Sequence, residues 1–158
     1  MKKLISHIDE NDVKCSTFSY KFYFKNALED LNFIAPNGYI AIKEEITFPI
    51  EEPIKSLFMH ISEENDNFEI QGATTDGSRG ELYIIHLTQE HFIMILNMLQ
   101  DLSDNISAYW ISYFIDNEII VDIGHANHGC TEQICFSHKV DESKIEKLQT
   151  IRKFKLIK

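Results

Sequence analysis

The sequence predicts a single α+β domain, in which a mostly antiparallel sheet of about five to seven strands is packed by two to three helices. The chain has 158 residues, the usual size of one domain. Stretches of period-two hydrophobicity alternate irregularly with a few stretches of helical spacing, without the regular strand–helix repeat of a parallel sheet. Hydrophobic residues make up 44% of the chain and extend from Leu4 to Ile157, so we expect residues 1–158 to share one core.

The first third of the chain predicts two strands with a short helix between them. Aromatic side chains occupy every second position in part of residues 15–24, which is typical of a strand with one aromatic face: Phe18, Tyr20, Phe22 and Phe24. Residues 26–34 have the apolar spacing of a short helix, which Pro36-Asn37-Gly38 ends. Residues 39–48 predict the second strand.

The middle third is less regular. Residues 54–61 fit either a strand or a short helix, and the polar residues 62–67 predict a loop. Residues 68–73 and 81–87 predict two strands of a hairpin, joined by the glycine-containing segment 74–80.

The last third contains the strongest local signals. A helix is predicted to begin after Thr88, a good N-cap, and to end near residues 103–105. Residues 107–115 and 118–123 predict a hairpin around Asp116-Asn117. A core strand (130–137), a helix capped by Asp141 and an edge strand within 152–158 complete the prediction.

The charge of the chain is unevenly distributed. Residues 26–138 carry nineteen acids and three bases, whereas the first 25 and last twenty residues carry net charges of +2 and +4, for a total of −10. Such a field repels nucleic-acid backbones and anionic membranes and attracts cationic proteins. We therefore expect no nucleic acid and no membrane as partner. The alternative interpretation is that the acidic residues only keep the protein soluble.

The cysteines and the absence of long apolar runs bear on the compartment. Cys15, Cys130 and Cys135 are an odd number in a chain large enough to fold without disulfides, which predicts free thiols in a reducing compartment. A Cys130–Cys135 disulfide is the alternative in an oxidising one. No segment has the length of a signal peptide or a membrane span, so the expected location is the cytoplasm.

Histidines and cysteines gather in residues 124–138, where they are His125, His128, Cys130, Cys135 and His138. Imidazole and thiolate are preferred zinc ligands, but these spacings match no zinc motif, and strand alternation places Cys135 on the face opposite Cys130. We therefore predict a polar loop, no metal, no cofactor and no catalytic residue. A metal site at His125, His128 and Cys130 stays an alternative, as does a thiol enzyme that uses Cys130 with a histidine base oriented by Asp122.

The segment Ala108-Tyr-Trp-Ile-Ser-Tyr-Phe-Ile-Asp-Asn-Glu-Ile-Ile-Val121 predicts an aromatic hairpin in a small acidic chain. In this respect the chain resembles small acidic immunity proteins of bacterial contact-dependent growth inhibition and polymorphic toxin systems. The resemblance implies a non-enzymatic α+β protein that blocks a cognate cationic toxin of nuclease type through an acidic face.

Acids in predicted turns are the candidates for that face, because turn residues are exposed: Glu63, Glu64, Asp66, Asp76, Asp116 and Glu118. A further alternative is a non-catalytic subunit of a larger assembly, with the aromatic segment 18–24 as its interface.

Overall fold

The computed structural model describes residues 2–9, 11–16, 20, 23–44, 49–71, 80–99, 108–124 and 133–157. Its strands are β1 (Lys3–Ile5), β2 (Val13–Ser16), β3 (Tyr39–Glu44), β4 (Phe68–Ile70), β5 (Leu82–His86), β6 (Ala108–Ile115), β7 (Glu118–Ile123), β8 (Ile134–Ser137) and β9 (Leu156–Ile157). Its helices are α1 (Phe24–Ile34), α2 (Ile54–Ile61), α3 (Gln89–Leu99) and α4 (Glu142–Arg152), with a short 3-10 helix, η1 (Asn65–Asn67).

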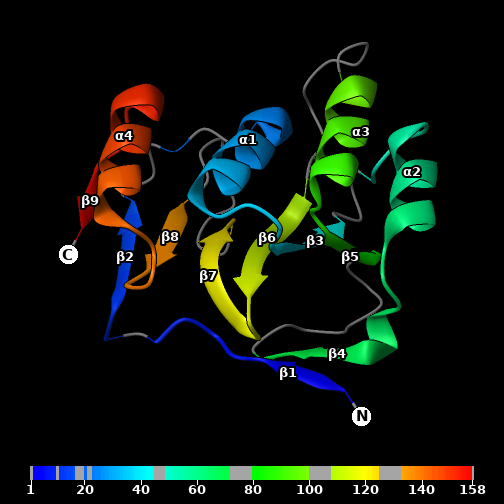
Figure 1. The fold of residues 1–158 in the computed structure, drawn as a ribbon, viewed down its shortest axis with the longest axis horizontal. Coiled ribbons are helices and arrows are strands. Elements are labelled where there is room, and N and C mark those ends of the chain that lie inside the picture. The colour runs from blue at the N-terminus through cyan, green and yellow to red at the C-terminus, as the bar shows by residue number, and fades with distance from the viewer. Residues whose placement is uncertain are drawn as a thin grey trace.

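The α+β prediction is confirmed. Within the described residues, seven strands form one antiparallel sheet in the order β5-β3-β6-β7-β8-β2-β9, and β1 and β4 form a separate parallel pair. The helices lie side by side in the order α4, α1, α3, α2 along the sheet (Figure 1). The structure describes four α-helices, whereas at most three were expected. The additional helix is α2, formed by residues 54–61, which fitted either a strand or a helix.

The sheet buries apolar side chains on both faces. Alternate residues of its strands pack with the helices in the larger core, as Ile42, Tyr113 and Val121 do. On the other face, Trp110 and Phe114 belong to a second core with Ile5 of β1. The pair β1 and β4 thus covers apolar surface that the helices leave open.

The predicted hairpin of residues 68–73 and 81–87 is wrong. β4 pairs with β1, and β5 pairs with β3. Sequence proximity favoured a hairpin, but Phe68 and Ile70 instead pack against the second core around Trp110 and Phe114. Residues 72–79 lie outside the described residues.

The strand expected over residues 15–24 is also partly wrong. β2 ends at Ser16, and Phe24 is the first residue of α1. Phe24 fits the strand pattern, but it fits a helical pattern equally well, because it is buried on the same face of α1 as Leu28 and Leu31. Tyr20 is buried, whereas Phe18 and Phe22 lie outside the described residues.

Local signals in the last third predicted its elements well. Asp116 and Asn117 have φ angles of 50° and 67°, as a tight hairpin turn requires. The Thr88 hydroxyl accepts a hydrogen bond from His91 N at 3.1 Å, and the Asp141 carboxylate accepts one from Ser143 N at 2.9 Å. Both capping predictions are therefore confirmed.

A buried carboxylate joins α1 to α4. Asp30 is 3% exposed, and both its oxygens accept hydrogen bonds from Arg152, at 2.8 to 3.2 Å. Tyr20 donates a further hydrogen bond to Asp30 at 3.2 Å. Burial and the negative charge of Asp30 raise the pKa of Tyr20 far above its ordinary value, so this hydroxyl stays protonated.

The expectation of three free thiols is corrected by a disulfide between Cys15 and Cys135. The two cysteines are register partners on the adjacent strands β2 and β8, and 120 residues separate them in the sequence. The sequence could not reveal this pairing, because it depends on which strands become neighbours. Cys130 lies outside the described residues.

Candidate partner-binding surface

The first group of predicted acids surrounds η1. Glu63, Glu64 and Asp66 are all exposed. Glu63 N donates to Ile84 O at 2.7 Å, which holds this segment against the edge strand β5. The backbone hydrogen bond to β5 therefore fixes the segment that carries these three exposed carboxylates.

The second group lies on the turn between β6 and β7. Asp116 is exposed, whereas Glu118 is half-buried and forms an ion pair with Lys139. Asp76, the remaining candidate, lies outside the described residues.

The strands β1 and β4 connect the two groups. η1 leads directly into β4, β4 pairs with β1, and the residue after β1, Ser6, donates from its backbone N to Asn117 O at 2.8 Å. Figure 1 shows β1 and β4 passing the β6–β7 turn at one end of the sheet. The two groups are thus linked through β4 and β1, but Glu63 lies beside the middle of β5, whereas Asp116 lies at the β6–β7 turn, two strands further into the sheet.

Basic residues from the two ends of the chain form ion pairs with some acids, but only one of these acids, Glu118, is a candidate for the binding surface. Lys139 pairs with Glu118 and Arg152 with Asp30, while Lys14 pairs with Glu142 of α4. Among the described residues, no ion pair involves any of four exposed acids: Glu63, Glu64, Asp66 and Asp116. These carboxylates retain their charge for a partner.

A cavity of about 300 Å³ lies beside the β6–β7 turn. Its charged lining residues are Asp116, Glu118, Lys139 and Asp141. Its apolar lining residues are Ile34, Ala35, Ile115, Ile120 and Val140. The lining therefore combines five apolar residues with three carboxylates and one lysine.

Asp141 is a residue of this cavity that sequence reasoning assigned only to helix capping. Both Ser143 N and Ser143 Oγ donate to Asp141 Oδ1, at 2.9 and 2.8 Å. These hydrogen bonds lower the pKa of Asp141 below its ordinary value, so the carboxylate stays charged. The turn position of Asp141, immediately before α4, was the available sequence signal.

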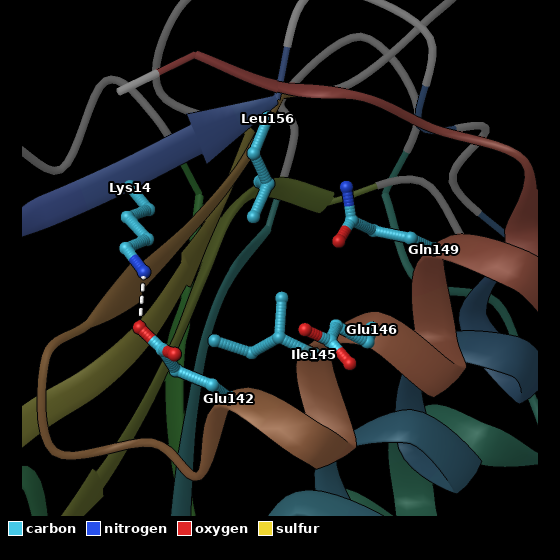
Figure 2. Close-up of a pocket in the computed structure, with 6 residues that line it drawn as sticks. All are labelled: Lys14, Glu142, Ile145, Glu146, Gln149 and Leu156. Carbon is cyan, nitrogen blue, oxygen red and sulfur yellow. Dashed lines mark hydrogen bonds and ion pairs between the residues drawn. The ribbon is translucent and has the colours of Figure 1, made fainter.

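Figure 2 shows a second pocket, of about 350 Å³, between α4 and the strands β2 and β9. Lys14 and Glu142 form an ion pair of 2.6 Å at one side of it, and Glu146 and Gln149 line another part. Ile145 and Leu156 complete the lining. Beyond the Lys14–Glu142 pair, one further acid, Glu146, lines this pocket, whereas Asp116 and Asp141 line the other cavity in addition to its Lys139–Glu118 pair.

His125, His128 and Cys130, the alternative metal or thiol site, lie outside the described residues, so this alternative is not tested. The nearby Asp122, which was considered as their orienting residue, is buried on β7 and accepts a hydrogen bond from Ser112 Oγ at 2.6 Å. Among the described residues, no group of three or more His, Cys, Asp or Glu side chains is arranged to hold a metal ion. None of the described helices is long and apolar enough to span a bilayer.

Comparisons with known protein families, with curated proteins and with solved structures found no match to this chain.

Proposed function

We propose that this chain is a binding protein that neutralises a basic protein, in the manner of an immunity protein that blocks a cognate toxin of nuclease type. The observation that supports the proposal most directly is a set of exposed carboxylates that form no ion pair within the described part of the chain: Glu63, Glu64, Asp66 and Asp116. A surface of this kind favours the approach of a protein rich in lysine and arginine.

The electrostatics of the whole chain point the same way. A net charge of −10 repels phosphate backbones and anionic lipid surfaces. It accelerates association with a cationic protein by about 10- to 10³-fold at low salt, and this acceleration falls as salt screens the field. The binding surface of a nuclease, which contacts nucleic acid, is itself basic. An acidic protein can therefore cover such a surface in place of the substrate.

The test is capture of a partner from the native host at low salt, with the folded chain of residues 1–158 as bait. We expect a basic protein that is toxic when expressed alone, whose nuclease activity is lost at a one-to-one ratio with this chain. The association rate should fall at least about tenfold between 10 and 150 mM salt. Capture of only acidic or neutral proteins, or an association rate that does not depend on salt, contradicts the proposal.

A matched pair of variants locates the charge that matters. The triple variant Glu63→Gln, Glu64→Gln, Asp66→Asn removes three charges at the proposed surface. The control variant removes three exposed charges from helices: Glu29→Gln, Glu90→Gln and Glu146→Gln. The first variant should slow association more than the second, although both have the same net charge.

We place this function in the cytoplasm, where the partner would otherwise act. The disulfide between Cys15 and Cys135 weighs against this placement, because a reducing cytoplasm keeps thiols reduced. Alkylation in intact cells, followed by intact-mass measurement, decides the question. Three modified cysteines support the cytoplasm, whereas a protein in which Cys15 and Cys135 are not modified belongs to an oxidising compartment.

A further inference from the structure

We propose that the cavity beside the β6–β7 turn, called here the Asp116 cavity, receives a lysine or arginine side chain of the partner protein. This inference rests on the proposed function and names the contact that anchors the partner. The nine residues that line the cavity, given above, all belong to the described part of the chain.

The floor of the Asp116 cavity suits the aliphatic part of such a side chain. Of its apolar lining residues, Ile120 and Val140 are buried and Ile115 is half-buried. Lysine and arginine have aliphatic stems that pack on apolar surface while their charged ends stay at the rim. A volume of about 300 Å³ is enough for one long side chain and small for a separate ligand of drug size.

The rim supplies the matching charge. Glu118 is paired with Lys139, which leaves Asp116 and Asp141 without an ion-pair partner among the described residues. The lining therefore carries three negative charges and one positive charge. Hydrogen bonds from Ser143 keep Asp141 ionised, as its lowered pKa indicates. The lining thus combines apolar residues with a net negative charge, while Lys144, which also lowers the pKa of Asp141, lies beside it at Ile34 O.

The ends of two helices also face this region. Ile34 and Ala35 lie at the C-terminal end of α1, where the helix dipole is negative and the last turn holds no basic residue. Lys144 already donates to Ile34 O at 3.1 Å, so this chain places a cation of its own at that end. The positive end of α4 is covered by the carboxylate of Asp141.

The first experiment uses a probe that needs no identified partner. We would titrate the folded chain with acetyl-lysine methylamide and follow the methyl resonances of Ile115, Ile120 and Val140 by NMR. Acetyl-norleucine methylamide, which has a similar stem without the charge, is the matched ligand control. We expect saturable shifts of these methyl groups with the lysine probe and at least about threefold weaker binding of the norleucine probe.

Two substitutions remove the rim charge without changing the shape of the turns. Asp116→Asn retains a residue that tolerates a positive φ angle, and Asp141→Asn retains an effective N-cap. Together they should weaken binding of the lysine probe about three- to tenfold. The control Glu63→Gln, Asp66→Asn removes the same charge at η1 and should leave probe binding within about twofold.

Removal of the competing cation should have the opposite effect. Lys139 is exposed and pairs with Glu118, so Lys139→Gln makes the rim more negative. This variant should bind the lysine probe about two- to fivefold more tightly.

Three outcomes would overturn the proposal. The lysine and norleucine probes could bind equally well, the double variant Asp116→Asn/Asp141→Asn could bind the lysine probe as tightly as the original chain, or the shifts could be confined to methyl groups outside the cavity.

The failure of the anchoring proposal can be distinguished from the failure of the proposed function. A basic partner that is captured, but that binds the Asp116→Asn, Asp141→Asn variant as tightly as the control variant, overturns the anchoring role of the cavity and leaves the neutralising function standing. Selective binding of the lysine probe, without any basic partner in the host, overturns the neutralising function. In that case the cavity would be a cation site without a protein partner, and the anchoring proposal would fall with the function.

Discussion

The pair of helices α1 and α4 carries carboxylates in two different settings. In one, Asp30 is buried and held by Arg152 and Tyr20. In the other, where α1 ends and α4 begins, Asp141 is exposed at the rim of the Asp116 cavity and has no ion-pair partner among the described residues. The same chemical group stabilises the fold in one place and is left available to a partner in the other.

The difference follows from solvation. A charge removed from water must be compensated by close partners, so the buried site has a guanidinium and a hydroxyl in place. A carboxylate at the surface keeps its hydration and needs no partner within the chain. Substitutions at the buried site should therefore change stability, whereas substitutions at the exposed site should change binding.

The largest expected effect is at the buried site. Arg152→Met keeps most of the aliphatic packing but leaves Asp30, which is 3% exposed, without its cation. The free energy of unfolding should fall by about 3 kcal/mol, measured by urea denaturation. Lys155→Met, which removes an exposed charge nearby, is the control and should change stability by less than about 0.5 kcal/mol.

Binding of the lysine probe by Arg152→Met tests the same contrast between the buried and the exposed carboxylate. Arg152→Met should retain the affinity of the folded chain for the lysine probe, because Arg152 does not line the Asp116 cavity. A loss of stability below about 1 kcal/mol would show that Asp30 is more solvated than its burial implies.

A smaller effect is expected at Tyr113, a residue of β6 that holds the turn after α1. Its hydroxyl accepts a hydrogen bond from Gly38 N at 2.8 Å and donates one to Ala35 O at 2.5 Å. A Cβ atom on residue 38 would lie 2.5 Å from the Tyr113 ring, so glycine is needed for this close approach. Tyr113→Phe leaves both backbone groups without this partner and should cost about 2 kcal/mol of unfolding free energy.

Tyr83 is the matched control for Tyr113, because it is 5% exposed and its hydroxyl has no hydrogen-bond partner among the described residues. Tyr83→Phe removes a buried hydroxyl that forms no hydrogen bond with the described part of the chain. It should therefore stabilise the chain by about 1 kcal/mol in the same urea assay. If both substitutions destabilise the chain equally, hydrogen bonding is not the cause of the Tyr113 effect.

The pH dependence of stability provides a further test. Burial raises the pKa of Tyr113 from 10.0 to about 12. Because the folded state has the higher pKa, the stability that this group contributes is complete below pH 10 and is lost as the pH rises towards about 12. The free energy of unfolding should decline over this window, and it should decline less steeply in Tyr113→Phe. An unchanged slope in the variant would assign the decline to other groups.

The smallest effect on stability is expected at the exposed site. The variant Asp116→Asn, Asp141→Asn should keep its melting temperature within about 2 °C of the original chain, because both asparagines suit their backbone positions. Its affinity for a captured basic partner should nevertheless fall about three- to tenfold. A large loss of stability would show that these carboxylates serve the fold, and the contrast with Asp30 would disappear.

Local sequence signals predicted several parts of the fold and of the candidate surface. The Asp116-Asn117 turn and the capping of α4 by Asp141 were both predicted, because each depends on a few neighbouring residues. Asp116 was selected as exposed for the same reason. Residues with two compatible patterns, such as Phe24, could not be assigned in this way.

The sequence by itself determined the α+β class, the acidic middle of the chain and the strongest turns and caps, because composition, periodicity and short-range hydrogen bonding are properties of adjacent residues. Only the tertiary structure decided that β4 joins β1, that Cys15 meets Cys135 and that Arg152 neutralises Asp30. It also placed Asp141 beside Asp116 around one cavity. Each of these contacts joins segments far apart in the chain, and their proximity depends on the order in which strands and helices pack.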